Sequence, residues 1–371
     1  MATTSSSQVS KTGRRFMLLL VSISFGLIAF TAESVSNKVT DIFRYQELYD
    51  SYSGSSFSDI GMKNPLFDSV NYILANYITG NSQFVGFFWI TLTYLFLLFS
   101  VIKISSKACR LEGDWVFLII VASLTIIPFV WVTELIKQSI SFSIFAYALS
   151  KKLSGEKNSY VFSLAALLLH IPVIILLPIY FYDNKFIRKY IVPIAILCFG
   201  LSFFNILELL NPIADFKIMD KIGLSERIKT YTGGYGFVIS KRFYLQLAFF
   251  VSQIILLVAF RFKKYDKTYL VLSILSLSML LVNMGNPHNF VRLIYVYFPF
   301  YIFVLVFTIS SMEKVINRVI VLCVTCSFYA ISNAIMTYKF VNSTTYSNHY
   351  MDNDLIKILF SNVGQFFQFS I

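Results

Sequence analysis

Long apolar runs, one after another along the chain, restrict most strongly what this protein can fold into. The first is 16–30 and the last is 319–337, and most have close to the roughly 20 residues that a helix needs to cross a bilayer core. The runs between them lie near 84–102, 114–132, 133–150, 160–182, 190–210, 243–260, 268–283 and 291–311. Because backbone groups in lipid must find partners within their own segment, these runs predict an all-α, multi-pass membrane helix bundle.

The composition agrees with a lipid environment. Hydrophobic residues make up 57% of the 371 residues and charged residues 13%, about half of the 25% charged residues typical of soluble domains. This balance excludes a soluble enzyme and a disordered chain. The net charge of +12 would suggest nucleic acid in a soluble protein, but in a membrane protein basic residues collect in short cytoplasmic loops. We therefore expect no nucleic-acid partner.

The first apolar run follows a basic stretch. Lys11, Arg14 and Arg15 precede it, as in the first part of a signal peptide. The many later runs favour an uncleaved anchor instead. Its flanking charges place the N-terminus in the cytoplasm.

The run 160–182 decides the topology, because His170 and Pro172 interrupt its middle and proline breaks the helical hydrogen-bond ladder. If it crosses, the basic loops 185–189 and 261–267 lie outside. If it turns back, every short, densely basic loop lies in the cytoplasm. We interpret this run as a re-entrant hairpin of two short helices, with His170 near its tip, beside about nine full spans. The alternative is a bundle of ten to eleven transmembrane helices.

This topology predicts a single transmembrane domain over 1–371 with three regions on its outer face. They are the loops 31–83 and 211–242 and the C-terminal tail 338–371. Within the first loop, apolar residues over 65–79 follow helical spacing, which predicts a helix lying along the membrane surface.

Ionisable residues beside apolar runs are candidate functional residues, since charge is costly in lipid. Glu134, Lys137 and Gln138 lie together at the outer end of the run 133–150. Glu134 and Lys137 are three residues apart and can pair on one helix face. They form either a simple interfacial ion pair or, with Gln138, a phosphate or sugar contact.

Further candidates follow later in the chain. His170 is either a core histidine or an acid, a base or a hydrogen-bond donor. Arg292 opens an apolar run, and Lys241 and Arg242 end the second outer loop. These three side chains either extend to the interface or provide cations for a phosphate.

Four residues of the first loop form the motif D-x-x-R-Y-x-x-x-Y: Asp41, Arg44, Tyr45 and Tyr49. A tyrosine suits a sugar, because its ring stacks and its hydroxyl bonds. The alternative is an interfacial aromatic belt. The sequence has no Walker loop, nucleotide fingerprint, H-E-x-x-H or D-x-D-like loop motif. We therefore expect no metal and no cofactor, and a substrate that is already activated in the membrane.

Taken together, these motifs resemble the bacterial polysaccharide repeat-unit polymerases, the Wzy-type O-antigen polymerases, and specifically their EpsG-like branch. Asn64-Pro-Leu-Phe67 stands where the family has E-P-L-F, and Lys137-Gln138 where it usually has Arg-Gln. Ala165 to His170 is similar to the family's small residue and histidine before a second short helix. Arg292-x-x-Tyr295 matches the opening of a late outer-face helix.

The resemblance implies a GT-C-like glycosyltransferase of the bacterial inner membrane. It would join oligosaccharide repeat units linked to undecaprenyl pyrophosphate, on the periplasmic face, during lipopolysaccharide or surface polysaccharide biosynthesis. Its partners would be the lipid-linked oligosaccharide, membrane lipid, a chain-length regulator protein and a flippase. We assign catalysis to His170, Arg292 and Lys137. Substrate binding is assigned to Asp41, Arg44, Tyr45, Tyr49, Glu134, Gln138, Lys241, Arg242 and Tyr295.

Two other functions are open at this point. A membrane acyltransferase that modifies surface polysaccharide would also have a buried histidine and arginine. A flippase or transporter would also have a broken helix and buried charges. No inverted repeat is visible in the sequence, which argues against a transporter.

Overall fold

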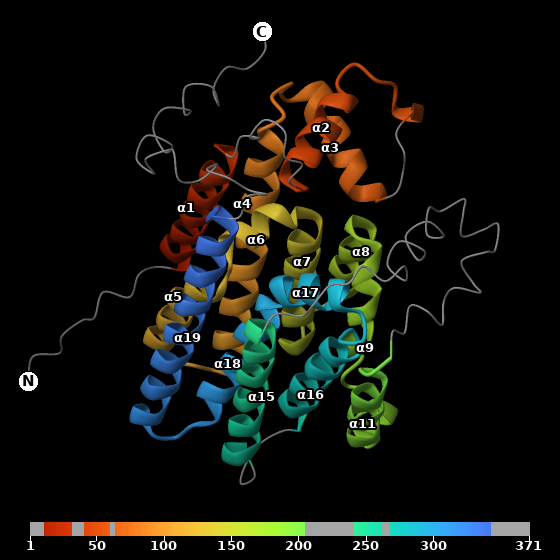
Figure 1. The fold of residues 1–371 in the computed structure, drawn as a ribbon. Helices are drawn as coiled ribbons and strands as arrows, with labels where there is room; N and C mark the ends of the chain where they lie inside the picture. The colour runs from red at the N-terminus through yellow and green to blue at the C-terminus, as the bar shows by residue number, and fades with distance from the viewer. Residues whose placement is uncertain (1–10, 32–40, 60–63, 205–240, 262–266, 343–371) are drawn as a thin grey trace, which may run out of the picture.

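The structure, a computed structural model, describes residues 11–31, 41–59, 64–204, 241–261 and 267–342. Within these ranges the chain forms helices and loops and no strand, so the all-α prediction is confirmed for them. The long helices pack side by side, and α2 and α3 form a separate group at one end (Figure 1). We call α2 and α3 the cap.

The helices of the first half of the chain are α1 (Lys11–Phe30), α2 (Asp41–Tyr52), η1 (Phe57–Asp59), α3 (Pro65–Tyr77), α4 (Phe84–Lys103), the π-helical turn η2 (Ile104–Ala108), α5 (Gly113–Ile126), α6 (Phe129–Glu134) and α7 (Ile136–Leu153). Those of the second half are α8 (Ser159–Leu169), the 3-10 helix η3 (Ile171–Leu176), α9 (Leu177–Tyr180), α10 (Lys185–Lys189), α11 (Ile191–Leu201), α15 (Lys241–Arg261), α16 (Thr268–Leu281), α17 (Pro287–Val296), α18 (Phe298–Ser311) and α19 (Val315–Asn342).

Two helical stretches of the described chain, Phe84–Ala108 and Val315–Ile335, are long and apolar enough to cross a bilayer. α17 and α18 together would make a third, bent by 55° where they meet. The other apolar helices have 10–17 residues. Membrane character is thus supported, whereas the expected nine spans and the hairpin's place in the bilayer stay predictions.

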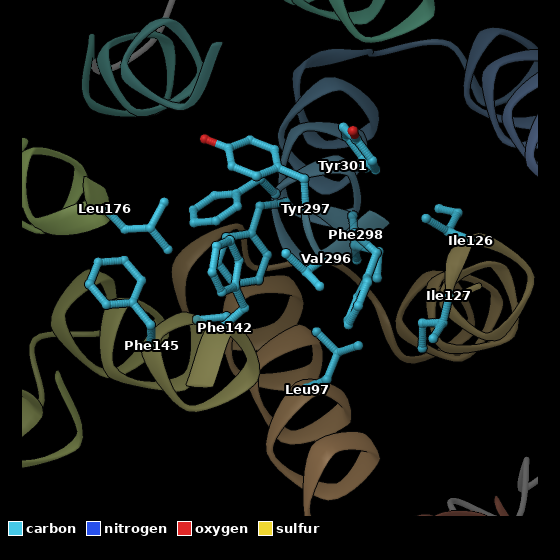
Figure 2. Close-up of a cluster of buried hydrophobic side chains, with 14 of the residues drawn as sticks. Leu97, Ile126, Ile127, Phe142, Phe145, Leu176, Val296, Tyr297, Phe298 and Tyr301 are labelled. Atoms are coloured by element: carbon cyan, nitrogen blue, oxygen red, sulfur yellow. The ribbon is translucent and has the colours of Figure 1, made fainter. Parts of the chain in front are cut away.

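The apolar run 291–311 is divided at Tyr297, the residue between α17 and α18. Pro299 lies in the first turn of α18, where a backbone N–H has no partner within the helix, so its absence costs nothing. In an uninterrupted helix through this position, that N–H would be needed as a hydrogen-bond donor. The break buries Tyr297 completely, and its hydroxyl donates to the Ser276 carbonyl oxygen of α16. Figure 2 shows this segment at the centre of the core, where it meets side chains of α4, α5 and α7 that include Leu97, Ile126, Phe142 and Phe145, and Ile127, which follows α5.

The cap is fastened to the bundle by a buried polar contact. Trp89 Nε1 of α4 donates to Asn71 Oδ1 of α3 at 2.8 Å, and Asn71 is 1% exposed. The helix predicted over 65–79 is confirmed as α3. It exposes Ile73 and Tyr77 on the side away from this contact, at 50% and 73%. Its position along the membrane surface stays a prediction.

The chain doubles back between α8 and α9. The Ser159 hydroxyl, at the start of α8, lies 2.7 Å from the Tyr180 hydroxyl at the end of α9. Lys152 Nζ, at the end of α7, donates to the Tyr180 carbonyl oxygen at 2.7 Å and to Asp183 Oδ1 at 2.6 Å. The first arm therefore begins, and the second arm ends, beside the C-terminus of α7.

His170 marks the turn between the two arms. Its extended backbone, with φ −156° and ψ 99°, ends α8. Pro172 then stands in the first turn of η3, where it needs no backbone donor. This is the geometry that the hairpin interpretation of 160–182 requires.

Basic segments from distant parts of the chain meet at the end of the bundle where α4 and α7 finish. Glu156 contacts Lys103 at 2.6 Å, Lys107 at 2.7 Å and Lys151 at 3.6 Å. Further contacts between loops and helix ends join Arg188 to Thr268, Tyr269 to Ala108, and Arg318 to Trp115. We call this the basic end; it comprises 103–110, 151–157, 185–189, 267–269 and 314–318.

α1 and α4 cross closely because small residues meet there. A Cβ atom on Gly86 of α4 would lie 2.9 Å from the Ala29 carbonyl oxygen of α1. Likewise, a Cβ on Gly26 would lie 2.8 Å from the Phe87 carbonyl oxygen. Small residues of this kind let the backbones of membrane helices approach.

Gly86→Leu is expected to destabilise the protein by about 1–3 kcal/mol or more, because the added side chain overpacks against the backbone of α1. Thermal unfolding of the detergent-solubilised protein measures the loss. Gly80→Leu is the matched control, since no atom lies within 4 Å of a Cβ at Gly80. Equal melting temperatures for the two variants would contradict this crossing.

The lysines around Glu156 predict a specific acid sensitivity. Hydrogen bonds from Lys103 and then Lys107 lower the pKa of the Glu156 carboxyl to about 2, from 4.5. A depressed folded pKa contributes stability that is complete above pH 4.5 and is lost as the pH falls towards 2. Wild type should therefore exceed Glu156→Gln in melting temperature at pH 6, and the difference should shrink between pH 4.5 and pH 2. A constant difference would contradict the lysine contacts.

Candidate functional site

A carboxyl group from the bundle binds the N-terminus of the first cap helix. Asp41 is the first residue of α2, and its backbone N–H donates to Glu134 Oε2 at 3.0 Å. Glu134 ends α6 and is 4% exposed. Because helix N-termini carry unpaired N–H groups, a buried carboxyl oxygen at this position supplies an acceptor that the helix lacks. Glu134 thus joins the cap to the bundle across 93 residues of sequence.

The side chain of Asp41 contacts two arginines. Arg44 Nη1 is 3.0 Å from Asp41 Oδ1, and Arg292 Nη2 of α17 is 3.7 Å from Asp41 Oδ2. The Arg44 side chain is 59% exposed and the Arg292 side chain 32%. A guanidinium has five N–H donors, so each arginine can bind a further anion while it contacts Asp41.

Lys137 lies between two aromatic rings. Its ammonium is 5.1 Å from the centre of the Tyr45 ring and 5.2 Å from that of Phe67. Phe67 in turn stacks on Trp89 of α4, with ring centres 4.9 Å apart. The cap therefore positions this cation by cation–π contacts. This also gives the N-P-L-F segment a structural role, since its Phe67 is fully buried beside Lys137.

The Tyr45 hydroxyl is close to the same charged groups. Burial, and then the carboxylate of Asp41, raise the pKa of Tyr45, while the charge of Arg292 and a backbone hydrogen bond from Lys137 act in the opposite direction. The phenol therefore stays protonated at neutral pH and can serve as a hydrogen-bond donor.

α17 contributes an aromatic wall. Tyr295 stacks on Trp131 of α6 with ring centres 3.7 Å apart, and Phe243 of α15 contacts the Tyr295 ring edge-on at 5.3 Å. His288 precedes Arg292 by one helical turn, close enough for the charges of Arg292 and Asp41 to act on it. Neither Trp131 nor His288 is among the residues assigned from the sequence. The only feature of the sequence that could have identified His288 is its position four residues before Arg292, which places both on one helix face.

The structure brings together seven of the predicted site residues, which we call the cationic cluster. They are Asp41, Arg44, Tyr45, Glu134, Lys137, Arg292 and Tyr295. Gln138 follows Lys137 on α7 and is half-buried, and its Oε1 has no hydrogen-bond partner within the described chain. His170 belongs to the hairpin, whose α8 packs against α3 of the cap.

The structure does not place the other three predicted residues, Tyr49, Lys241 and Arg242, in the cationic cluster. Tyr49 is fully buried, and its hydroxyl donates to the Thr79 carbonyl oxygen at 2.7 Å, so that hydroxyl is engaged inside the cap. Lys241 and Arg242 begin α15, but their side chains lie outside the described residues. Most of the loop 211–242 and of the tail 338–371 lies outside them as well.

The expectation that Glu134 and Lys137 pair on one helix face is wrong. The helix is interrupted at Leu135, whose φ −107° and ψ 44° lie outside the helical region. Glu134 therefore ends α6 and Lys137 lies in α7. Glu134 turns to the amide of Asp41 and Lys137 to the rings of Tyr45 and Phe67.

The cationic cluster has the chemistry of an anion site. Arg44, Lys137 and Arg292 provide three cations against the two carboxyl groups of Asp41 and Glu134, beside aromatic rings suited to a sugar. In the described part of the chain, no group of three or more His, Cys, Asp or Glu residues is placed to hold a metal ion.

Apolar helices of spanning length, together with a partly exposed cationic cluster, define an integral membrane protein with a polar site. A model of the EpsG family matches residues 16–351, and the chain belongs to that family. Membership indicates a membrane protein of the polysaccharide-polymerase type. No curated protein and no solved structure matches the chain.

A double-mutant cycle tests the site geometry. We expect Phe67→Leu and Lys137→Met to show a coupling energy of about 0.5–2 kcal/mol, because each removes one partner of a cation–π contact. Equilibrium unfolding in mixed micelles provides the four free energies. The control cycle pairs Phe67→Leu with Lys107→Met at the basic end, where we expect no coupling. Equal coupling in both cycles would contradict the contact.

Proposed function

We propose that this protein is an O-antigen polymerase, a glycosyltransferase that joins repeat units carried on undecaprenyl pyrophosphate into a longer lipid-linked glycan. The observation that carries the proposal is the cationic cluster. Three cations, an aromatic wall and a protonated tyrosine converge in a membrane protein of the EpsG family. A lipid-linked saccharide pyrophosphate presents the matching parts, namely two phosphates and a sugar.

The cations would act on the leaving group. As the acceptor hydroxyl attacks the anomeric carbon of the donor sugar, the bond from that carbon to the pyrophosphate oxygen breaks and its electron pair leaves with the phosphate. Negative charge thus develops on the pyrophosphate, and preorganised cations stabilise that charge in the transition state. We assign this role to Arg292 and Lys137, with Arg44 and Arg242 as further contacts.

The remaining groups would bind the sugars and deprotonate the acceptor hydroxyl. The proton of the attacking hydroxyl must be taken up by a base, and His170 at the hairpin tip is our assignment. Asp41, Tyr45 and Tyr49 are assigned to the sugars, with Glu134, Gln138 and Tyr295 around them. Glu134 also holds the N-terminus of α2, which positions Asp41.

The basic end supports an orientation. Basic residues are retained in cytoplasmic loops, so we place the basic end and the N-terminus in the cytoplasm and the cap at the periplasmic face of the inner membrane. The cluster then faces the leaflet in which a translocated repeat unit would wait. The hairpin would enter the bilayer from the cytoplasmic side.

Deletion of the gene tests the reaction, with surface polysaccharide resolved by gel electrophoresis. A polymerase predicts loss of the long-chain ladder with a single repeat unit still attached. Loss of every unit would indicate a flippase, and a normal ladder with altered acylation would indicate an acyltransferase. Either result would overturn the proposal.

Complementation of the deletion strain tests the residues. We expect Arg292→Ala to lower polymer formation by about 10²-fold, the usual effect of removing one donor to a transition-state anion, and Lys137→Ala and His170→Ala to lower it as well. Lys314→Ala, an exposed lysine at the basic end, should restore the full ladder. Full restoration by Arg292→Ala and His170→Ala would refute the site assignment.

A further inference from the structure

A small pocket with a few polar groups lies beside the cationic cluster, between helices that are far apart in sequence. It is lined by Gln246 of α15, Tyr329 and Asn333 of α19 and Tyr295 of α17, with Ile126 and Phe298 among its apolar walls. The space open to the centre of a water-sized group is about 10 Å³, about the minimum that holds one water molecule. The pocket therefore suits one small group.

The amide side chains of the pocket are held in place. Gln246 Nε2 donates to Ser332 Oγ at 2.8 Å, and Asn333 Nδ2 donates to the Thr125 carbonyl oxygen at 2.8 Å. These bonds tie α15 to α19 and α19 to α5. The carboxamides therefore form a fixed polar wall within an otherwise apolar bundle.

The Tyr329 hydroxyl lacks a partner in this wall. Tyr329 is 1% exposed, and within the described residues its hydroxyl has no hydrogen-bond partner. A buried hydroxyl without a partner costs free energy. Since Tyr329 lines the pocket, a group that enters the pocket can supply the missing bond.

Tyr295 connects the pocket to the cationic cluster. Its ring stacks on Trp131 at 3.7 Å and also forms part of the pocket lining. Arg292 lies one turn before it on α17. A substrate whose phosphate contacts Arg292 would thus carry its next groups past the Tyr295 ring.

We infer that this pocket accepts one hydroxyl group of a neutral sugar residue of the glycan substrate, with the Tyr329 hydroxyl as its hydrogen-bonding partner. The inference rests on the proposed function. None of the residues that line the pocket is charged, so the pocket does not suit the phosphates. Carboxamides and aromatic rings together match the hydroxyls and the apolar faces of a saccharide.

Tyr329→Phe tests the inference with purified protein in detergent. The two ligands are the lipid-linked repeat unit, extracted from the deletion strain, and glycan-free undecaprenyl pyrophosphate. We expect the variant to bind the repeat unit on the order of three- to tenfold more weakly, the effect of one lost hydrogen bond, and glycan-free undecaprenyl pyrophosphate within twofold of wild type. The melting temperature should be unchanged or higher, since an unpaired hydroxyl is removed.

Tyr94→Phe is the matched control, because Tyr94 is a tyrosine of α4 that is 1% exposed and does not line the pocket. It should leave both affinities unchanged. Equal loss of both affinities in Tyr329→Phe, or a lower melting temperature with unchanged affinities, would indicate a structural water and overturn the inference. If wild type binds the repeat unit but forms no polymer, the proposed function fails while the pocket assignment is still tested by binding.

Discussion

The hydrogen bond from the Asp41 amide to Glu134 is the contact on which the arrangement of the site depends. It places a buried carboxyl group at the N-terminus of α2, where the first N–H groups of the helix need acceptors. The cap is thereby fixed to the bundle beside the break between α6 and α7. Asp41 can then reach Arg292 on α17, and the Tyr45 ring can reach Lys137 on α7. One part-buried hydrogen bond is thus linked to the positions of cations from three segments.

The bundle separates its charges into two groups with different tasks. At the basic end, Lys103, Lys107 and Lys151 surround Glu156, and the contacts there join loops and helix ends. In the cationic cluster there are fewer carboxyl groups than cations, and Lys137 lies between two aromatic rings. The first arrangement joins loops and helix ends of the bundle. The second has an excess of positive charge, and the neutral pocket of Tyr329 lies next to it.

The sequence predicted much of the site and erred where the backbone breaks. The motif around Asp41 and Tyr45 identified residues that do meet, and Arg292 was found because an arginine beside an apolar run is costly. The pairing of Glu134 with Lys137 failed because it assumed a continuous helix through Leu135. Trp131 offered no signal in an aromatic-rich chain. The pocket of Tyr329 could not be predicted either, because its wall combines helices separated by more than 200 residues.

The sequence by itself determined the helical class, the positions of most helices and the family. These follow from local properties: apolar runs of spanning length, prolines that interrupt them, and motifs in a fixed order. Only the tertiary structure decided which charges meet. Glu134 could have paired with Lys137, and Arg292 could have extended to the interface. Both Glu134 and Arg292 contact Asp41 because of the way α2, α6 and α17 pack. No periodicity along the chain relates residues that are 93 positions or more apart.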